Sequence, residues 1–379
     1  MKRKLDIPLI ITVFLICIYG IVMIYSASSV WAEYKFNDKF HYVLMQSIFF
    51  IIGIILMIIV SKVPYKYYLK KSNMILLICF ILLILVLMPG IGSVRNGSRS
   101  WFGVAGLGIQ PSEFAKTILI LFLAVTFEAL IKVRNLSNVG KVLPFIVPLI
   151  FIFLIFEQPD FGTMMVLVGI TGVIFFMVPY DKKTKLVMVS FTLISVLILA
   201  LVMSITGKGL SASQKSRFNF KDPCTRYREK TGYQVCNGYI AINSGGLLGS
   251  GYGNSKQKYL YLPEAHTDFI FAIIIEEMGL LVGILIILSY FIMIWRILMI
   301  GKRAYNLQGS IICYGVATYL ALHVMINLGG VLGVIPLTGV PLPFYSYGGS
   351  FMINLLICLA LVQRVSVENK IFEQRHIVR

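Results

Sequence analysis

The chain has 379 residues, of which 58% are hydrophobic and only 13% are charged, and its mean hydropathy is +0.86. A soluble protein of this length needs far more charged surface, so the composition excludes a soluble enzyme or binding module and indicates an integral membrane protein. The net charge of +18 comes mainly from basic residues between apolar blocks. We therefore expect membrane lipid, and no nucleic acid, as a partner of its surface.

Apolar blocks recur along the whole chain, and most are long enough to cross a bilayer as a helix. A span needs about 20 apolar residues, and it must be helical because a lone strand would leave backbone groups unpaired in lipid. The first block follows the segment Met1–Lys4 and is interpreted as a retained span, not a signal peptide. The sequence predicts an all-α membrane protein, a single multi-pass domain over 1–379, with about ten transmembrane helices at 7–25, 42–60, 74–88, 112–131, 144–158, 161–179, 186–204, 268–297, 309–329 and 348–366.

The charges between the blocks predict the orientation. Each segment assigned to the inside is basic, for example the segment that holds Lys182, Lys183 and Lys185. This pattern satisfies the positive-inside rule when both termini are cytoplasmic. A large extracytoplasmic loop, about residues 205–267, then lies between the seventh and eighth spans.

The large loop carries nine Lys and Arg residues against three acidic ones. The excess is explained either by anionic headgroups beside a solvated loop or by a site for an anionic substrate. Cys224 and Cys236 share the loop, where they can form a disulfide or remain two free thiols. The glycine-rich run at 244–253 lacks the lysine of a phosphate-binding loop. We expect it to be a tight, close-packed loop.

Ionisable residues at membrane depth are the informative ones, because burying a charge is costly unless it is paired or functional. Glu113 and Lys116 lie three apart on one helix face at the start of the fourth span. Asp160 lies between the fifth and sixth spans, and Asp268 opens the eighth. Either aspartate could serve only as a helix cap. For Lys116 the leading acidic partners are Asp160 and Glu276.

Asp268 and Glu276 cannot form a paired-carboxylate site, because eight residues of helix separate them by roughly 12 Å. If Asp268 acts as a base, it acts alone. His266 and His323 are too isolated in the sequence to form a metal cluster, and no Cys or His spacing indicates zinc. The sequence therefore offers no set of metal ligands as a metal-site candidate.

Motifs in a fixed order connect these residues to a known family. They are the segment 97–116, QPDFGT at 158–163, GYQ at 232–234, AINSGGLLGSGYG at 241–253, KQKYLYLPEAHTDFIF at 256–271 and PLPFYSYGGS at 341–350. With these motifs the chain resembles the SEDS family (shape, elongation, division and sporulation) of RodA-, FtsW- and SpoVE-type membrane proteins. The resemblance covers essentially the whole chain.

The resemblance implies a peptidoglycan glycosyltransferase of the bacterial cytoplasmic membrane. Such an enzyme polymerises lipid II, a disaccharide peptide on a polyprenyl pyrophosphate, at the outer face of the membrane. It implies a class B penicillin-binding protein, a transpeptidase, as a partner. The pyrophosphate leaving group needs positive charge and leaves room for a divalent cation, although no ligand cluster demands one. No other cofactor is expected.

The resemblance also assigns roles to individual residues. It implies that Asp268 is the general base that takes the proton of the acceptor hydroxyl, with inversion at the anomeric carbon. It implies substrate binding by Trp101, whose indole can lie along a sugar or lipid chain, and by a basic residue at Arg217. The other residues at polar family positions are expected to bind substrate or to shape its cavity: Glu113, Lys116, Asp160, Glu264 and His266.

Some alternatives remain open. The family tryptophan often follows an arginine directly, whereas Ser100 precedes Trp101 here and the nearest arginine is Arg99. The run at 255–271 favours an FtsW-type role in septum synthesis, and the run at 341–350 is compatible with a RodA-type role in elongation. Outside enzymes, a lipid II flippase and a non-enzymatic scaffold are the competing classes. The basic loop and the absence of an inverted repeat argue against a flippase.

Overall fold

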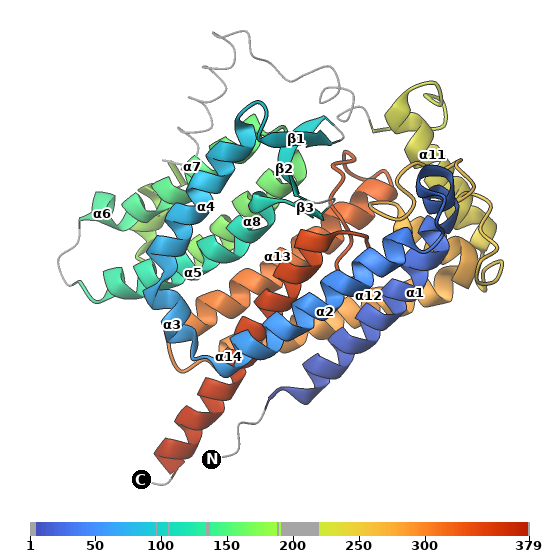
Figure 1. Cartoon of the computed structure of the whole chain (residues 1–379). Coiled ribbons are helices and arrows are strands. Elements are labelled where there is room, and N and C mark those ends of the chain that lie inside the picture. The colour runs from blue at the N-terminus through green and yellow to red at the C-terminus, as the bar shows by residue number, and fades with distance from the viewer. Residues whose placement is uncertain are drawn as a thin grey trace.

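The computed structural model describes residues 5–95, 97–104, 107–133, 137–187, 189–190 and 220–377. The helices and strands of these residues are labelled in Figure 1. The helices are α1 (Ile7–Phe36), α2 (His41–Lys62), α3 (Tyr65–Lys70), α4 (Ser72–Leu87), α5 (Pro111–Ile131), α6 (Asn138–Val142), a 3-10 turn η1 (Leu143–Phe145), α7 (Ile146–Glu157), α8 (Phe161–Met177), α11 (Lys230–Gly245), α12 (Ile270–Lys302), α13 (Leu307–Val331) and α14 (Gly349–Ile377).

The expectation of an all-α multi-pass membrane protein is confirmed. In the described part of the chain, seven helices are long and apolar enough to cross a membrane: α1, α2, α5, residues 140–157 ending α7, α12, α13 and α14. The shorter helices α4 and α8 are also apolar. Together they correspond to the expected spans except that at 186–204, most of which lies outside the described residues.

The long helices pack around α13 and α14. Helix α14 is largely buried and lies against α2 and α13, whereas α2 exposes many of its apolar side chains. In Figure 1, α4, α5, α7 and α8 lie to one side of α13 and α14, with α1, α2 and α12 on the other. The exposed faces carry apolar side chains such as Leu285 and Phe291 on α12, as expected of helices whose solvent is lipid.

The loop between α4 and α5 forms a small antiparallel sheet that the sequence analysis did not predict. Its strands are β1 (Gly92–Arg95), β2 (Ser98–Val104) and β3 (Leu107–Ile109), in the order β1-β2-β3. Gly97 turns the chain between β1 and β2 at φ +83°, a backbone conformation that favours glycine. We call the end of the bundle that carries this sheet and α11 the sheet end; α1 begins and α14 ends at the opposite end (Figure 1).

The large loop contains helix α11, and a disulfide joins Cys224 to Cys236. The glycine-rich run after α11 is a close-packed turn, as predicted. It lies against a break in α12 at Gly279, where φ is +86°. Four backbone hydrogen bonds join the run to the break: Leu280 N–H to Gly246 O, Leu281 N–H to Leu247 O, Ser250 N–H to Glu276 O, and Gly251 N–H to Glu277 O.

These four bonds explain how α12 can be broken within an apolar helix. A break leaves N–H and C=O groups without helical partners, and lipid offers none. The glycine-rich run supplies both donors and acceptors at the break. A Cβ on Gly249 would lie 2.3 Å from Glu277 O, and one on Gly279 would lie 2.3 Å from Leu247 O. The two backbones therefore meet at a distance that only glycine permits.

Candidate active site at the sheet end

Asp268 lies in the turn that precedes α12, not in the helix itself. The N-cap position of α12 is Phe269, so Asp268 lies one residue before it. The Asp268 residue is 9% exposed, and Thr267 Oγ1 lies 3.1 Å from its Oδ1. A Cβ on Gly339 would be 3.7 Å from Asp268 Oδ2. The loop between α13 and α14 (residues 332–348, the α13–α14 loop) therefore passes directly beside the carboxylate.

Glu264 and His266 belong to the same turn as Asp268. Glu264 adopts φ +57°, and its carboxylate is 2.7 Å from Thr267 Oγ1. His266 is buried, with its ring 4.3 Å from that of Tyr42 and 6.0 Å from that of Tyr347. Burial lowers the pKa of His266 to about 4, despite the opposing effect of Glu264. The imidazole is therefore neutral at pH 7 and can accept or donate hydrogen bonds without carrying charge.

The prediction for the partner of Lys116 was wrong. Lys116 Nζ is 2.8 Å from Glu113 Oε1 on the preceding turn of α5 and 3.1 Å from His323 Nε2 on α13. Tyr319 donates its hydroxyl to Glu113 Oε2 at 3.2 Å. Lys116 is fully buried and Glu113 nearly so. The helix-face pair at i and i+3 thus provides the counter-ion, and the imidazole provides a second contact.

Asp160 and Glu276, the two expected partners, are used elsewhere. Asp160 caps α8 by accepting from Thr163 N–H, and it accepts a second bond from Gln110 Nε2 at 2.9 Å. Glu276 accepts from Lys256 N–H at 3.0 Å and from Ser255 Oγ at 2.5 Å. Neutral donors therefore satisfy both carboxylates: a backbone N–H and a side-chain amide for Asp160, and a backbone N–H and a hydroxyl for Glu276.

Trp101 lies half-buried on β2, with its carbonyl accepting from Ser93 Oγ at 3.0 Å. The sheet that carries it is fastened to the bundle. Ser350 at the start of α14 donates to Gly108 O at 3.1 Å and accepts from Gln110 N–H at 3.0 Å. The bonds from Gln110 to both Ser350 and Asp160 link the Trp101 sheet to α8 and α14. The first turn of α14, directly after the α13–α14 loop, thus positions the sheet.

Arg217, the basic residue expected to face the pyrophosphate, lies outside the described residues. Another buried ion pair was missed by the sequence analysis. Lys258 Nζ is 2.9 Å from Glu277 Oε1, 3.1 Å from Ser26 Oγ and 2.6 Å from Gly253 O. The signal for it was the second carboxylate of the Glu276–Glu277 run, which sits deep in an apolar helix and needs a counter-ion.

The structure brings the predicted residues into connected groups at one end of the bundle. Asp268, Glu264 and His266 share one turn, and the α13–α14 loop joins that turn to the buried Lys116–Glu113 pair through His323, whose Nδ1 is 3.3 Å from Pro341 O. In the described part of the chain, no three His, Cys, Asp or Glu residues are grouped so as to hold a metal ion. The turn at this end therefore places two carboxylates, of Asp268 and Glu264, beside the buried imidazole of His266.

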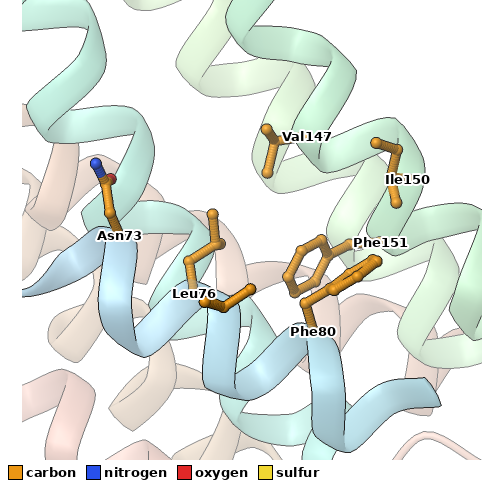
Figure 2. Close-up of a pocket in the computed structure, with 7 residues that line it drawn as sticks. Asn73, Leu76, Phe80, Val147, Ile150 and Phe151 are labelled. Carbon is orange, nitrogen blue, oxygen red and sulfur yellow. The ribbon is translucent and has the colours of Figure 1, made fainter.

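A groove elsewhere on the surface does not belong to this network. It has a volume of about 280 Å³ and lies between α4 and α7, lined by apolar side chains except for Asn73 (Figure 2). Its walls include Phe80 and Phe151, and the polar groups described above take no part in it. A site for a sugar pyrophosphate needs polar contacts that this groove lacks. The polar turn at Asp268 is therefore the better candidate.

The fold and its polar end define a multi-pass α-helical membrane protein with a charged, loop-covered site at one end of the bundle. The chain belongs to the cell cycle protein family of FtsW, RodA and SpoVE, whose family model matches residues 7–371. This confirms the family expected from the motifs.

Individual relatives and solved structures agree with the family assignment. Stage V sporulation protein E of Bacillus subtilis is 39% identical, over 96% of this chain and 98% of that protein. The probable peptidoglycan glycosyltransferase FtsW of the same organism is 34% identical, over 99% and 94%. RodA of Thermus thermophilus is 26% identical with a TM-score of 0.68, over 96% and 97%. A chain of a peptidoglycan synthase complex described as coordinating polymerization and crosslinking is 27% identical with a TM-score of 0.74, over 97% and 98%.

Proposed function

We propose that the chain is a peptidoglycan glycosyltransferase that polymerises lipid II at the outer face of the cytoplasmic membrane. Membership of a family whose relatives include probable peptidoglycan glycosyltransferases supports this activity. The observation that carries the proposal for the site is the carboxylate of Asp268, held in a turn at the sheet end beside the α13–α14 loop. Both termini are then cytoplasmic, and the sheet end faces outward.

In the proposed reaction, Asp268 is the general base. It takes the proton from the hydroxyl of the acceptor sugar as that oxygen attacks the anomeric carbon of the donor. The bond from that carbon to the pyrophosphate breaks on the opposite side, so an α-linked donor becomes a β-linked glycan. The departing pyrophosphate takes the electron pair, and positive charge at this end of the protein stabilises it. Arg217 and the basic residues of the large loop are the proposed source of that charge.

The remaining residues have supporting roles in this proposal. Trp101, on strand β2 of the small sheet, provides an apolar surface for a sugar or the lipid chain. Glu264 and His266 shape the turn that holds Asp268 and border the substrate. Asp160 and the Lys116–Glu113 pair shape the interior on which the sheet and α14 rest.

We further propose that the chain acts with a crosslinking transpeptidase of the class B penicillin-binding protein type. The similarity to a chain of a peptidoglycan synthase complex supports such a partner. The FtsW-type role in the division septum stays a prediction, because the relatives include both a sporulation protein and FtsW-type proteins.

The test is polymerisation of labelled lipid II by the purified chain together with its transpeptidase. Asp268→Asn keeps the side-chain size but removes the basic oxygen, and we expect it to lower the polymerisation rate by about 10²-fold or more. Asp181→Asn, at an exposed acidic residue beyond the end of α8, is the matched control and should keep the normal rate. Normal glycan synthesis by folded Asp268→Asn protein would rule out the base. A wild-type complex that moves lipid II across vesicles without making glycan would favour the flippase.

A further inference from the structure

Three successive carbonyl groups around Asp268 each accept a hydrogen bond from α13 or the α13–α14 loop. Buried carbonyl groups need hydrogen-bond donors, and here another part of the chain supplies them. The bonds are Tyr347 N–H to His266 O at 2.9 Å, Ser346 Oγ to Thr267 O at 2.5 Å, and Asn327 Nδ2 to Asp268 O at 2.8 Å. Successive peptide planes are thereby fixed, so the Asp268 side chain leaves the main chain in one direction.

Asn327 makes the last of these bonds and is the one side chain of α13 among the three donors. The carbonyl of Asp268 lies before the first helical bond described for α12, in which Ala272 N–H donates to Phe269 O. It therefore needs a donor from outside the helix. Asn327 supplies this donor from a residue that is only 3% exposed.

The same amide also holds the α13–α14 loop. Asn327 Nδ2 donates to Val340 O at 2.8 Å as well as to Asp268 O. Because both neighbours are carbonyl oxygens, only the amide nitrogen can face them. One NH₂ group therefore sets the spacing between the Asp268 turn and the loop at Gly339, where an added Cβ would lie 3.7 Å from Asp268 Oδ2.

A second buried asparagine shows what a purely structural amide looks like in this chain. Asn369, near the end of α14, donates to Ile300 O and accepts from Tyr305 N–H, each at 3.2 Å, and is 5% exposed. Both ends of its amide are satisfied. In Asn327 the nitrogen is doubly used, but no donor among the described residues reaches the buried Oδ1. Asn327 thus binds two carbonyl groups through its nitrogen, while its own buried oxygen has no hydrogen-bond donor in the described part of the chain.

We propose that Asn327 is a positioning residue for the reaction: it orients the Asp268 carboxylate by holding the Asp268 peptide against the α13–α14 loop. The inference rests on the proposed function, because it assumes that Asp268 is the base. A base must lie within about 3 Å of the proton that it takes, and a displacement of about 1 Å can cost about 10²-fold in rate. Removing the NH₂ group takes the donor away from both Asp268 O and Val340 O, which loosens the turn and the loop at these two points.

The experiment compares Asn327→Ala, Asn327→Ser and the matched control Asn369→Ala, each purified in complex with the transpeptidase. Initial rates of glycan synthesis are measured against lipid II concentration and pH, and are normalised to the folded fraction. Hydrogen exchange of residues 264–270 is followed in parallel, because it needs no activity. We expect both Asn327 variants to lower kcat by about 10- to 100-fold with KM changed less than about twofold, to shift the acid limb of the pH–rate profile and to speed exchange at 264–270.

The control separates positioning from stability. Asn369→Ala should lose comparable thermal stability yet keep kcat per folded molecule and the wild-type exchange at 264–270. Unchanged kcat in folded Asn327 variants, or an equal fall in kcat for Asn369→Ala, would overturn the inference. So would failure of both Asn327 variants to fold while Asn369→Ala folds, because the role would then be structural. A wild-type complex that makes no glycan contradicts the proposed function instead. In that case, faster hydrogen exchange at 264–270 in the Asn327 variants would still show that Asn327 holds the Asp268 turn.

Discussion

The strongest stability prediction concerns the buried charge of Lys116. Its Nζ contacts Glu113 Oε1 at 2.8 Å and His323 Nε2 at 3.1 Å, and it lies 5.0 Å from the centroid of the Tyr319 ring. Lys116→Met keeps a long apolar side chain but removes the ammonium. The Glu113 carboxylate would then keep only the Tyr319 hydroxyl, a single neutral donor, among the side-chain contacts described here.

The magnitude follows from burial. Removing one member of a buried ion pair leaves an uncompensated charge and costs about 3–5 kcal/mol. The side chains of Lys116 and Glu113 are 0% and 4% exposed, so solvent gives little screening. Lys116→Met combined with Glu113→Gln removes the stranded charge as well. We expect this double variant to be more stable than Lys116→Met alone by about 2–3 kcal/mol.

A double-mutant cycle in detergent, followed by denaturant titration, measures this coupling. The matched control is the pair Lys132–Glu128 at the C-terminal end of the same helix, where the side chains are 72% and 19% exposed. Lys132→Met should cost less than about 1 kcal/mol. The reasoning is refuted if Lys116→Met costs no more than Lys132→Met. It is also refuted if adding Glu113→Gln makes the Lys116→Met protein no more stable.

Two further predictions concern the turn at His266 and the break in α12. Because burial lowers the folded pKa of His266 to about 4, below the unfolded value near 6.5, protonation favours unfolding as the pH falls through this window. The wild type should therefore lose about 3 kcal/mol between pH 7 and pH 4 that His266→Gln does not lose, as measured by unfolding at each pH. Gly279→Ala should cost about 3 kcal/mol or more in an unfolding assay, because it combines positive φ with backbone contacts below 3 Å. Gly172→Ala, with no atom within 4 Å of the new Cβ, should be neutral or stabilising; equal losses at both glycines would contradict this.

The membrane spans could be predicted because their signal is physical and local. Uninterrupted apolar blocks and basic flanks report directly on transfer into lipid and on orientation. The sheet at 92–109 could not be predicted in the same way. Its strands are short and rich in glycine and serine, and the antiparallel pairing of Phe102 with both Gly92 and Ile109 depends on a bulge and a turn. Such strands show little alternation of apolar and polar residues, which is the pattern by which a strand is predicted from sequence.

The sequence allowed a prediction of which polar residues lie close together, but not of how they pair. Asp268, Glu264 and His266 lie in one turn because they are close in the sequence. The partner of Lys116 was misjudged because its acidic partner was sought in other segments of the chain, whereas Glu113 on the preceding turn of α5 provides it. Instead, the Glu276 carboxylate accepts hydrogen bonds from backbone N–H groups of the loop at 255–257. No sequence pattern shows that this loop folds back onto α12. Asn327 gave no signal either, because a lone asparagine in an apolar helix has many structural uses.

The two buried networks meet at one short stretch of the α13–α14 loop. His323 and Asn327 lie four residues apart on α13, and hence on one face of the helix. His323 approaches Pro341 O at 3.3 Å, and Asn327 donates to the preceding carbonyl, Val340 O, at 2.8 Å. The same helix face therefore connects the Lys116 ion pair and the Asp268 turn to adjacent residues of the loop. A charge that stabilises the interior of the bundle thus also helps to fix the loop beside the proposed base, because both act through the position of α13.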